Sequence, residues 1–83
     1  MQDISNLPDD YIEQLHMRIG KNVKSAREKK GLTQLQLSQL IGHKSVTIIS
    51  RAEICYKGQH FNIEHLAKIA YVLEVDLCTF FDE

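Results

Sequence analysis

The sequence of 83 residues has little of several features that mark specialised protein classes. No apolar run approaches the roughly 18 residues of a membrane span, and the first residues are acidic where a signal or transit peptide would be basic. Its two cysteines, Cys55 and Cys78, are too few for a disulfide framework. These absences argue against a membrane-spanning or disulfide-rich secreted protein and predict a cytoplasmic protein with free thiols.

The short chain also leaves little room for an active site. A domain of this size buries only about 60 % of the surface that its unfolded chain exposes, so a core and a deep cleft compete for the same residues. His16 and His43 have no adjacent nucleophile or carboxylate pair, and the evenly spaced Cys55, His60 and His65 do not match the usual zinc pairs. We therefore predict no enzymatic activity, no metal and no cofactor.

The near-neutral net charge of −1 conceals a strong asymmetry along the chain. Residues 1–16 carry a net charge of −4, residues 17–60 carry +7, and residues 61–83 again carry −4. A basic block of this kind is either a solvated set of helix faces or a surface that binds a polyanion. Charge alone leaves these two interpretations open.

Apolar residues recur at three- and four-residue spacing and show no convincing period of two, which predicts an all-α protein. A first helix is indicated by Pro8 with acidic residues beside it, and Gly31 is a C-capping glycine at its far end. Gly20 interrupts the pattern, so the segment before it is expected to be a separate short helix or an arm. We divide the chain into an acidic arm or helix extension at 1–14 and a domain at 15–83.

Four further helices are indicated, each by a residue that can cap its N-terminus. Gln36 follows the first of these caps at the spacing of a capping box, and Gly42 ends that helix. The caps are Thr33, Ser45, Asn62 and Asp76. The first helix carries an apolar stripe of Ile12, Leu15, Ile19, Val23 and Ala26. In the later helices the positions expected to face the core are Leu37, Leu40, Ile41, Ile49, Ala52, Ile63, Leu66, Ile69, Ala70 and Leu73. The sequence thus predicts a compact bundle of five helices.

The second and third helices, joined by a short turn with Gly42, form a helix-turn-helix candidate. In such a unit the third helix, here residues 45–53, enters the major groove of duplex DNA while the preceding helix crosses the backbone. Polar donors on or before it are Lys44, Ser45, Thr47 and Arg51, and Val46 and Ile48 are suited to thymine methyl groups. Gln34, at the start of the second helix, is suited to a phosphate. Arg51 is expected to donate to guanine, with phosphate contact as the alternative.

An ordered series of motifs carries a family resemblance. The motifs are Gly31-Leu32-Thr33-Gln34, Leu37, Ile41-Gly42, Ile49-Ser50-Arg51-Ala52-Glu53, Leu66-Ala67-Lys68-Ile69-Ala70 and Leu77 to Phe81. Together they resemble the phage repressor and Cro type of helix-turn-helix, also called the XRE family, over roughly residues 15–83. The resemblance implies a lambda-repressor-like fold of five helices, binding of double-stranded DNA as a homodimer, and control of transcription. It also implies a structural ion pair between Arg27 and Glu53.

Two segments depart from the family pattern. The distance from Gly42 to Glu53 is one residue longer than usual, and we place the extra residue in the turn, at His43-Lys44. The loop after Glu53 is also longer and runs to Phe61. The phosphate contacts expected from this loop fall among Tyr56, Lys57 and Gln59, and we assign Lys57 as the DNA-binding residue of the three.

The two acidic ends suggest protein contacts. Leu77, Phe80 and Phe81 are expected to lie in the core for the most part. One of them is also a candidate for a homodimer interface, because a small domain often hides an apolar C-terminal helix in a dimer. The acidic arm motivates an alternative function, in which the chain is an antitoxin-like or other protein-interaction module whose main partner is a protein.

Overall fold

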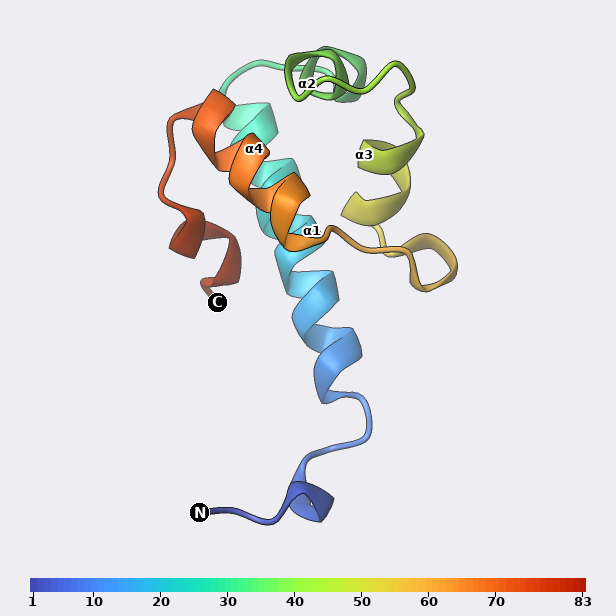
Figure 1. The fold of residues 1–83 in the computed structure, drawn as a ribbon, viewed down its shortest axis with the longest axis vertical. Coiled ribbons are helices and arrows are strands. Elements are labelled where there is room, and N and C mark those ends of the chain that lie inside the picture. The colour runs from blue at the N-terminus through green and yellow to red at the C-terminus, as the bar shows by residue number, and fades with distance from the viewer.

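The computed structural model describes all residues from 1 to 83 and contains four α-helices and no strand. The α-helices are α1 (Tyr11–Lys29), α2 (Gln34–Leu40), α3 (Thr47–Glu53) and α4 (Ile63–Leu73) (Figure 1). Three short 3₁₀ helices accompany them: η1 (Ile4–Asn6), η2 (Tyr56–Gly58) and η3 (Leu77–Phe81). The all-α class is confirmed. No helix combines the length and the apolar content that crossing a bilayer requires.

The prediction of five α-helices is wrong because the last element is a 3₁₀ helix. Asp76 caps it as expected, by accepting a hydrogen bond from the Cys78 N–H at 3.0 Å. Its backbone bonds join residues three apart, from Thr79 N–H to Asp76 O and from Asp82 N–H to Thr79 O. A segment of this length is typical of the tighter helix, whose hydrogen bonds close over fewer residues.

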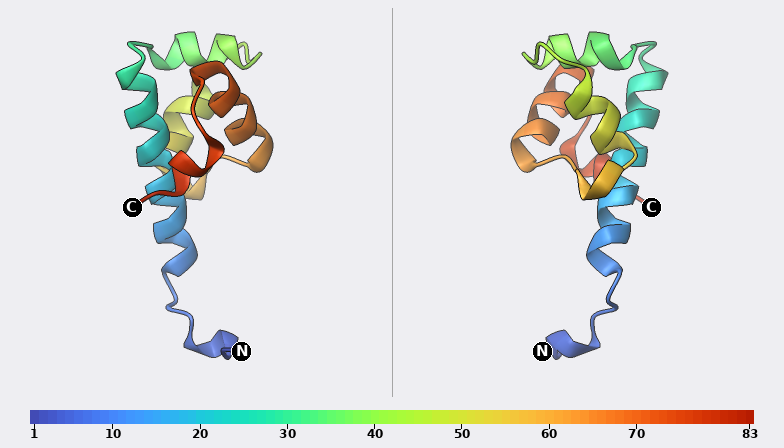
Figure 2. Two further views of the ribbon diagram at one scale, coloured as in Figure 1. Left: turned by 90° about the vertical axis from the view of Figure 1, so that its left-hand side faces the viewer. Right: turned by 90° about the vertical axis from the view of Figure 1, so that its right-hand side faces the viewer.

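Helix α1 is the longest element, and it begins at Tyr11, beyond Pro8. It passes through Gly20 without a break, so the expected separate short helix before Gly20 is wrong and the proposed boundary between residues 14 and 15 lies inside α1. Residues 1–10, which we call the arm, are all exposed. The arm extends away from the helical body in every ribbon view (Figures 1 and 2).

The core joins all four α-helices and the C-terminal segment. Most of the predicted core positions are buried, but Ile12, Leu40 and Ile63 are 53 %, 54 % and 78 % exposed. Ile12 is the second residue of α1, and Ile63 is the first residue of α4. Leu40 is the last residue of α2, which directs Leu37 and Ile41 inward. The buried apolar residues are Ile19, Val23, Ala26, Leu37, Ile41, Ile49, Ala52, Phe61, Leu66, Ile69, Ala70, Leu73 and Phe80.

Two capping boxes start α2 and α4. Thr33 Oγ1 accepts from Gln36 N–H at 3.0 Å, and Gln36 Oε1 accepts from Thr33 N–H at 2.8 Å, which confirms the first box. Asn62 Oδ1 accepts from His65 N–H at 2.7 Å, while His65 Nδ1 accepts from Asn62 N–H at 3.1 Å. In each helix the box therefore satisfies the N–H groups of the cap residue and of the third helical residue with local side chains.

The cap of α3 differs from the prediction. Val46 occupies the N-cap position and offers no side-chain bond, because the helix begins at Thr47 and not at Ser45. Ser45 still satisfies a free donor by accepting from Thr47 N–H at 3.2 Å. Residues 45 and 46 thus belong to the turn before α3.

Gly20 allows α1 and α3 to approach closely. A Cβ atom built on Gly20 would lie 2.7 Å from the carbonyl oxygens of both Ala52 and Glu53, at the C-terminal end of α3. Real Cβ atoms do not approach backbone oxygens this closely, so a side chain here would push the two helices apart. The glycine that weakens the helical pattern in the sequence is therefore a packing requirement.

We expect Gly20→Ala to destabilise the protein. Alanine is favoured over glycine inside a helix by about 1 kcal/mol, but the backbone clash should outweigh this gain and produce a net loss of about 1–3 kcal/mol. Urea unfolding followed by circular dichroism measures the difference. Lys21→Ala, at an exposed position of the same helix, is the control and should change stability by less than about 0.5 kcal/mol. A Gly20→Ala variant as stable as the unaltered chain would contradict this account.

Candidate nucleic-acid interface

Helices α2 and α3 are joined by a turn of residues 41–46 that ends α2 with a glycine motif. Gly42 has φ of +88°. Its N–H donates to Gln39 O, and the His43 N–H donates to Ser38 O at 2.8 Å. These two bonds close the C-terminus of α2 in the manner of a Schellman motif. His43 and Lys44 lie outside both helices, so the longer spacing is accommodated in the turn and not in α3.

A buried ion pair fixes α3 against α1. Arg27 Nε donates to Glu53 Oε2 at 2.8 Å, and Arg27 Nη2 donates to Glu53 Oε1 at 3.1 Å. Both residues are buried, with 7 % and 4 % of their surface exposed. The hydrogen bond to Glu53 raises the pKa of Arg27, so the guanidinium remains charged in its buried site. A further N–H, on Nη1, donates to Leu32 O at 2.7 Å.

Gln34 joins this pair, which the sequence alone did not indicate. Its Nε2 donates to Glu53 Oε1 at 2.9 Å, linking the first residue of α2 to the last residue of α3. Nineteen residues separate the two positions, so no local spacing could reveal the contact. One N–H and the carbonyl oxygen of the half-buried Gln34 side chain remain for other partners.

The outer face of α3 and of the preceding turn is polar. Lys44, Ser45, Thr47 and Arg51 are exposed. The hydroxyl groups of Ser45 and Thr47 hydrogen-bond to each other at 2.8 Å. Val46 and Ile48 are half-buried, and Ile48 also packs against the core. Five of these six residues therefore lie together in the turn before α3 and at its N-terminal end, and Arg51 lies one turn further along the helix.

The segment after α3 brings Tyr56 beside two cations. The Arg51 guanidinium carbon lies 5.4 Å from the Tyr56 ring centre, and Lys57 Nζ lies at the same distance. All three side chains are exposed. Tyr56, one of three residues considered for phosphate contact in the loop, thus has a neighbour on α3 that sequence spacing could not show.

The evenly spaced Cys55, His60 and His65 do not meet at one point. His60 stacks on His16 with ring centres 3.6 Å apart, whereas His65 lies near His43 at 5.5 Å. Burial lowers the pKa values of both His16 and His65 and raises the pKa of the Cys55 thiol. No group of three or more histidine, cysteine or acidic side chains is arranged to hold a metal ion.

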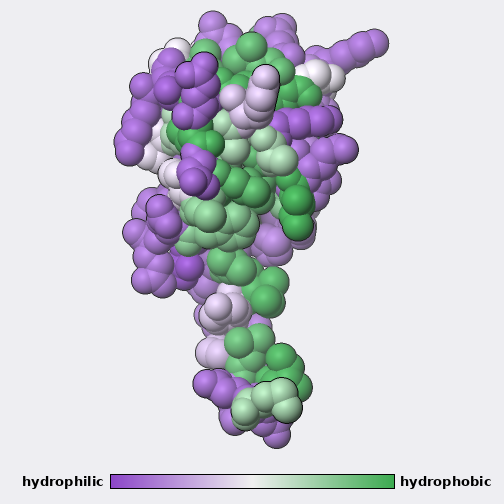
Figure 3. Space-filling view, turned by 60° about the vertical axis from the view of Figure 1, so that its left-hand side comes forward, coloured by the Kyte–Doolittle hydropathy of each residue, from purple (hydrophilic) through white to green (hydrophobic).

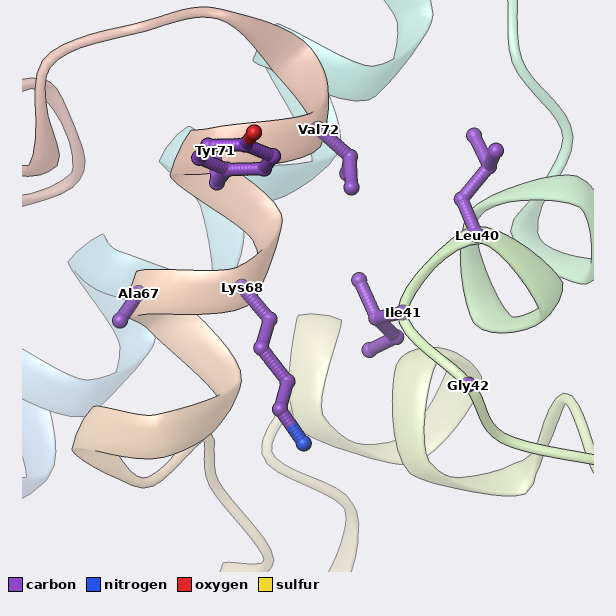
Figure 4. A pocket seen from close by; sticks show the side chains of 7 residues that line it. All are labelled: Leu40, Ile41, Gly42, Ala67, Lys68, Tyr71 and Val72. Carbon is purple, nitrogen blue, oxygen red and sulfur yellow. The ribbon is translucent and has the colours of Figure 1, made fainter.

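An apolar groove lies between the end of α2 and α4 (Figure 4). It encloses about 550 Å³, and Lys68 is the one charged residue among those that line it. The exposed Leu40 forms part of its wall, and Lys68 and Tyr71 face it from α4.

The three residues chosen for a dimer surface do not share one environment. Phe80 is 0 % exposed and belongs to the core of its own chain, as expected for most of these residues, which leaves Leu77 and Phe81 as the interface candidates. Phe80 is held there because η3 packs against α1, where Asn22 Nδ2 donates to the Phe80 carbonyl oxygen at 3.0 Å. Leu77 and Phe81 reach the surface.

Comparison with known proteins decides the family. A family model described as helix-turn-helix matches residues 23–80, from the middle of α1 almost to the end of η3. The chain belongs to the Cro/C1-type helix-turn-helix (XRE) family. Membership makes this XRE-family protein a DNA-binding regulator of transcription at the level of the family. No curated protein matches the chain.

We expect Glu53→Gln to destabilise this XRE-family protein strongly. The change leaves the Arg27 guanidinium buried without its carboxylate, and breaking one side of a buried pair costs about 3–5 kcal/mol. The free energy of unfolding in urea measures the loss. Glu64→Gln is the matched control, because Glu64 makes an exposed pair with Lys68 at 3.6 Å, worth at most about 1 kcal/mol. Similar small losses in the two variants would show that the buried pair is not a major contributor.

Proposed function

We propose that the protein binds double-stranded DNA sequence-specifically as a homodimer and regulates transcription as a repressor or controller. Residues 45–53 lie in the major groove in this proposal, with α3 as the recognition helix. One observation carries it. The cations Lys44, Arg51 and Lys57 are exposed on or beside α3, and none of them forms an ion pair. Arg27, which joins α1 to α3, is instead buried and forms an ion pair with Glu53.

The proposed contacts divide into base and phosphate contacts. Arg51 donates to guanine, and Val46 and Ile48 meet thymine methyl groups from the N-terminal part of α3. Ser45 and Thr47 offer hydroxyl groups that now bond to each other and can exchange partners on binding. The phosphate contacts come from Gln34, Lys44 and Lys57.

Base and phosphate contacts should respond differently to mutation. Arg51→Ala should cost about 1–3 kcal/mol on the preferred site and relax its specificity, whereas Lys44→Ala should weaken all duplexes alike and reduce the salt slope by about one. Fluorescence anisotropy at several salt concentrations measures both effects. The probe is a duplex that the unaltered chain selects from a randomised library.

The control for this experiment is Lys68→Ala, which removes a cation of α4 outside the proposed interface. It should leave affinity and salt slope nearly unchanged. Binding that is independent of salt, or no duplex selected at all, would refute the proposal. Equal behaviour of Arg51→Ala and Lys44→Ala would refute the division of roles.

A homodimer is supported by the apolar surface near the C-terminus. Leu77 and Phe81 remain partly exposed on η3, and hydrophobic residues are spread over the face shown in Figure 3. A two-fold dimer would place the same residues of both copies against each other. It would also present two copies of α3 to half-sites about one helical turn of DNA apart.

We expect Leu77→Asp to shift the protein from dimer to monomer. At a two-fold contact the new carboxylate lies opposite the same carboxylate of the second protomer. Repulsion between the two charges then adds to the cost of removing each from water, and both weaken the dimer. Sedimentation equilibrium measures the dimer dissociation constant, which should rise at least tenfold. Ile4→Asp, an equivalent change on the exposed arm, should leave it unchanged. The opposite ranking of the two variants would move the interface from η3 to the arm.

A protein-binding role for the arm is the second candidate function. Met1, Ile4 and Leu7 are exposed apolar side chains on a segment with no buried residue. Such a row is typical of a segment that a partner covers. If this is the main function, Ile4→Asp should abolish partner binding while leaving duplex affinity intact.

A further inference from the structure

We propose that Tyr56 is a positioning residue that holds Arg51 and Lys57 in place for DNA. The base contact of Arg51 and the phosphate contact of Lys57 then depend on each other. The inference rests on the proposed function and deepens it. It assigns to the loop after α3 a part in specificity, in addition to attraction for the DNA backbone.

The geometry of the ring supports this role. Both cationic groups lie 5.4 Å from the Tyr56 ring centre, within the range of a cation–π interaction. Neither cation has a carboxylate partner in the chain. The negative face of an aromatic ring is the neighbouring group that attracts both cations. The ring thus holds Arg51 and Lys57 beside one residue of the loop.

The backbone of the loop brings these side chains together. Cys55, Lys57 and Gly58 all have positive φ, at 53°, 49° and 77°. This conformation is uncommon for residues with a Cβ atom, and it turns the chain sharply after α3. Hydrogen bonds from Gly58 N–H to Cys55 O and from Gln59 N–H to Tyr56 O, both 3.0 Å long, close the turn. Tyr56 and Lys57 are therefore kept near the end of the recognition helix.

The arrangement has a consequence for binding. A free arginine or lysine side chain loses rotamer freedom when it is fixed on DNA, and a side chain already held in place loses less. Tyr56 is 43 % exposed, so the cations beside it remain accessible to a ligand. Both cations lie over the ring, so the aromatic face is the part of the side chain that this role requires.

The test compares Tyr56→Leu, which removes the ring, with Tyr56→Phe, which keeps it. The probes are the duplex selected by the unaltered chain and the same duplex with the guanine contacted by Arg51 replaced. Tyr56→Leu should bind the selected duplex about two- to fivefold more weakly and should discriminate less between the two probes. Tyr56→Phe should match the unaltered chain in both respects. Circular dichroism melting identifies loss of folding, and Tyr56→Gln serves as a second ring-free variant.

A double-mutant cycle provides the readout that a merely structural role would not affect. In the unaltered background, Arg51→Ala and Lys57→Ala should be non-additive in their effects on duplex affinity, and in the Tyr56→Leu background they should be additive. Equal or tighter binding by folded Tyr56→Leu, or additivity in both backgrounds, would overturn the inference while leaving the proposed function intact. Failure of the unaltered chain to select any duplex would instead overturn the proposed function.

Discussion

The carboxylate of Glu53 is the point at which three segments of the protein meet. It accepts two hydrogen bonds from Arg27 of α1 and one from Gln34 of α2, while Glu53 itself ends α3. Burying a carboxylate and a guanidinium is costly unless their hydrogen-bonding capacity is used, and here it is used by side chains and by the Leu32 carbonyl. The orientation of α2 and α3 relative to α1 depends on this cluster.

The close packing at Gly20 acts together with the ion pair. The missing side chain lets the last carbonyl groups of α3 approach α1, and this proximity brings Glu53 within reach of Arg27. With Ile49 and Ala52 turned into the core, the opposite face of α3 is directed outward. The exposure of Arg51 therefore follows from the same contacts that hold the helix in place.

Local sequence signals predicted the elements well. The capping box of α2, the cap Asn62 of α4 and most core positions depend on residues only a few places apart. The same holds for Gly31 and Gly42, which end α1 and α2 with positive φ, so these causes can be read directly from spacing. The failures occur where an element begins or ends. Ile12, Leu40 and Ile63 fit the apolar pattern but lie in the first or last two residues of their helices, where the side chains are exposed.

The sequence by itself determined the all-α class, the helix starts at Thr33 and Asn62, the basic block of residues 17–60 and the family resemblance. These properties depend on composition and on interactions between near neighbours. Only the tertiary structure decided that Gly20 lies against the end of α3, that Gln34 hydrogen-bonds to Glu53, and that Tyr56 lies beside Arg51 and Lys57. Such contacts depend on how helices pack and how a loop turns, and residue spacing does not specify either.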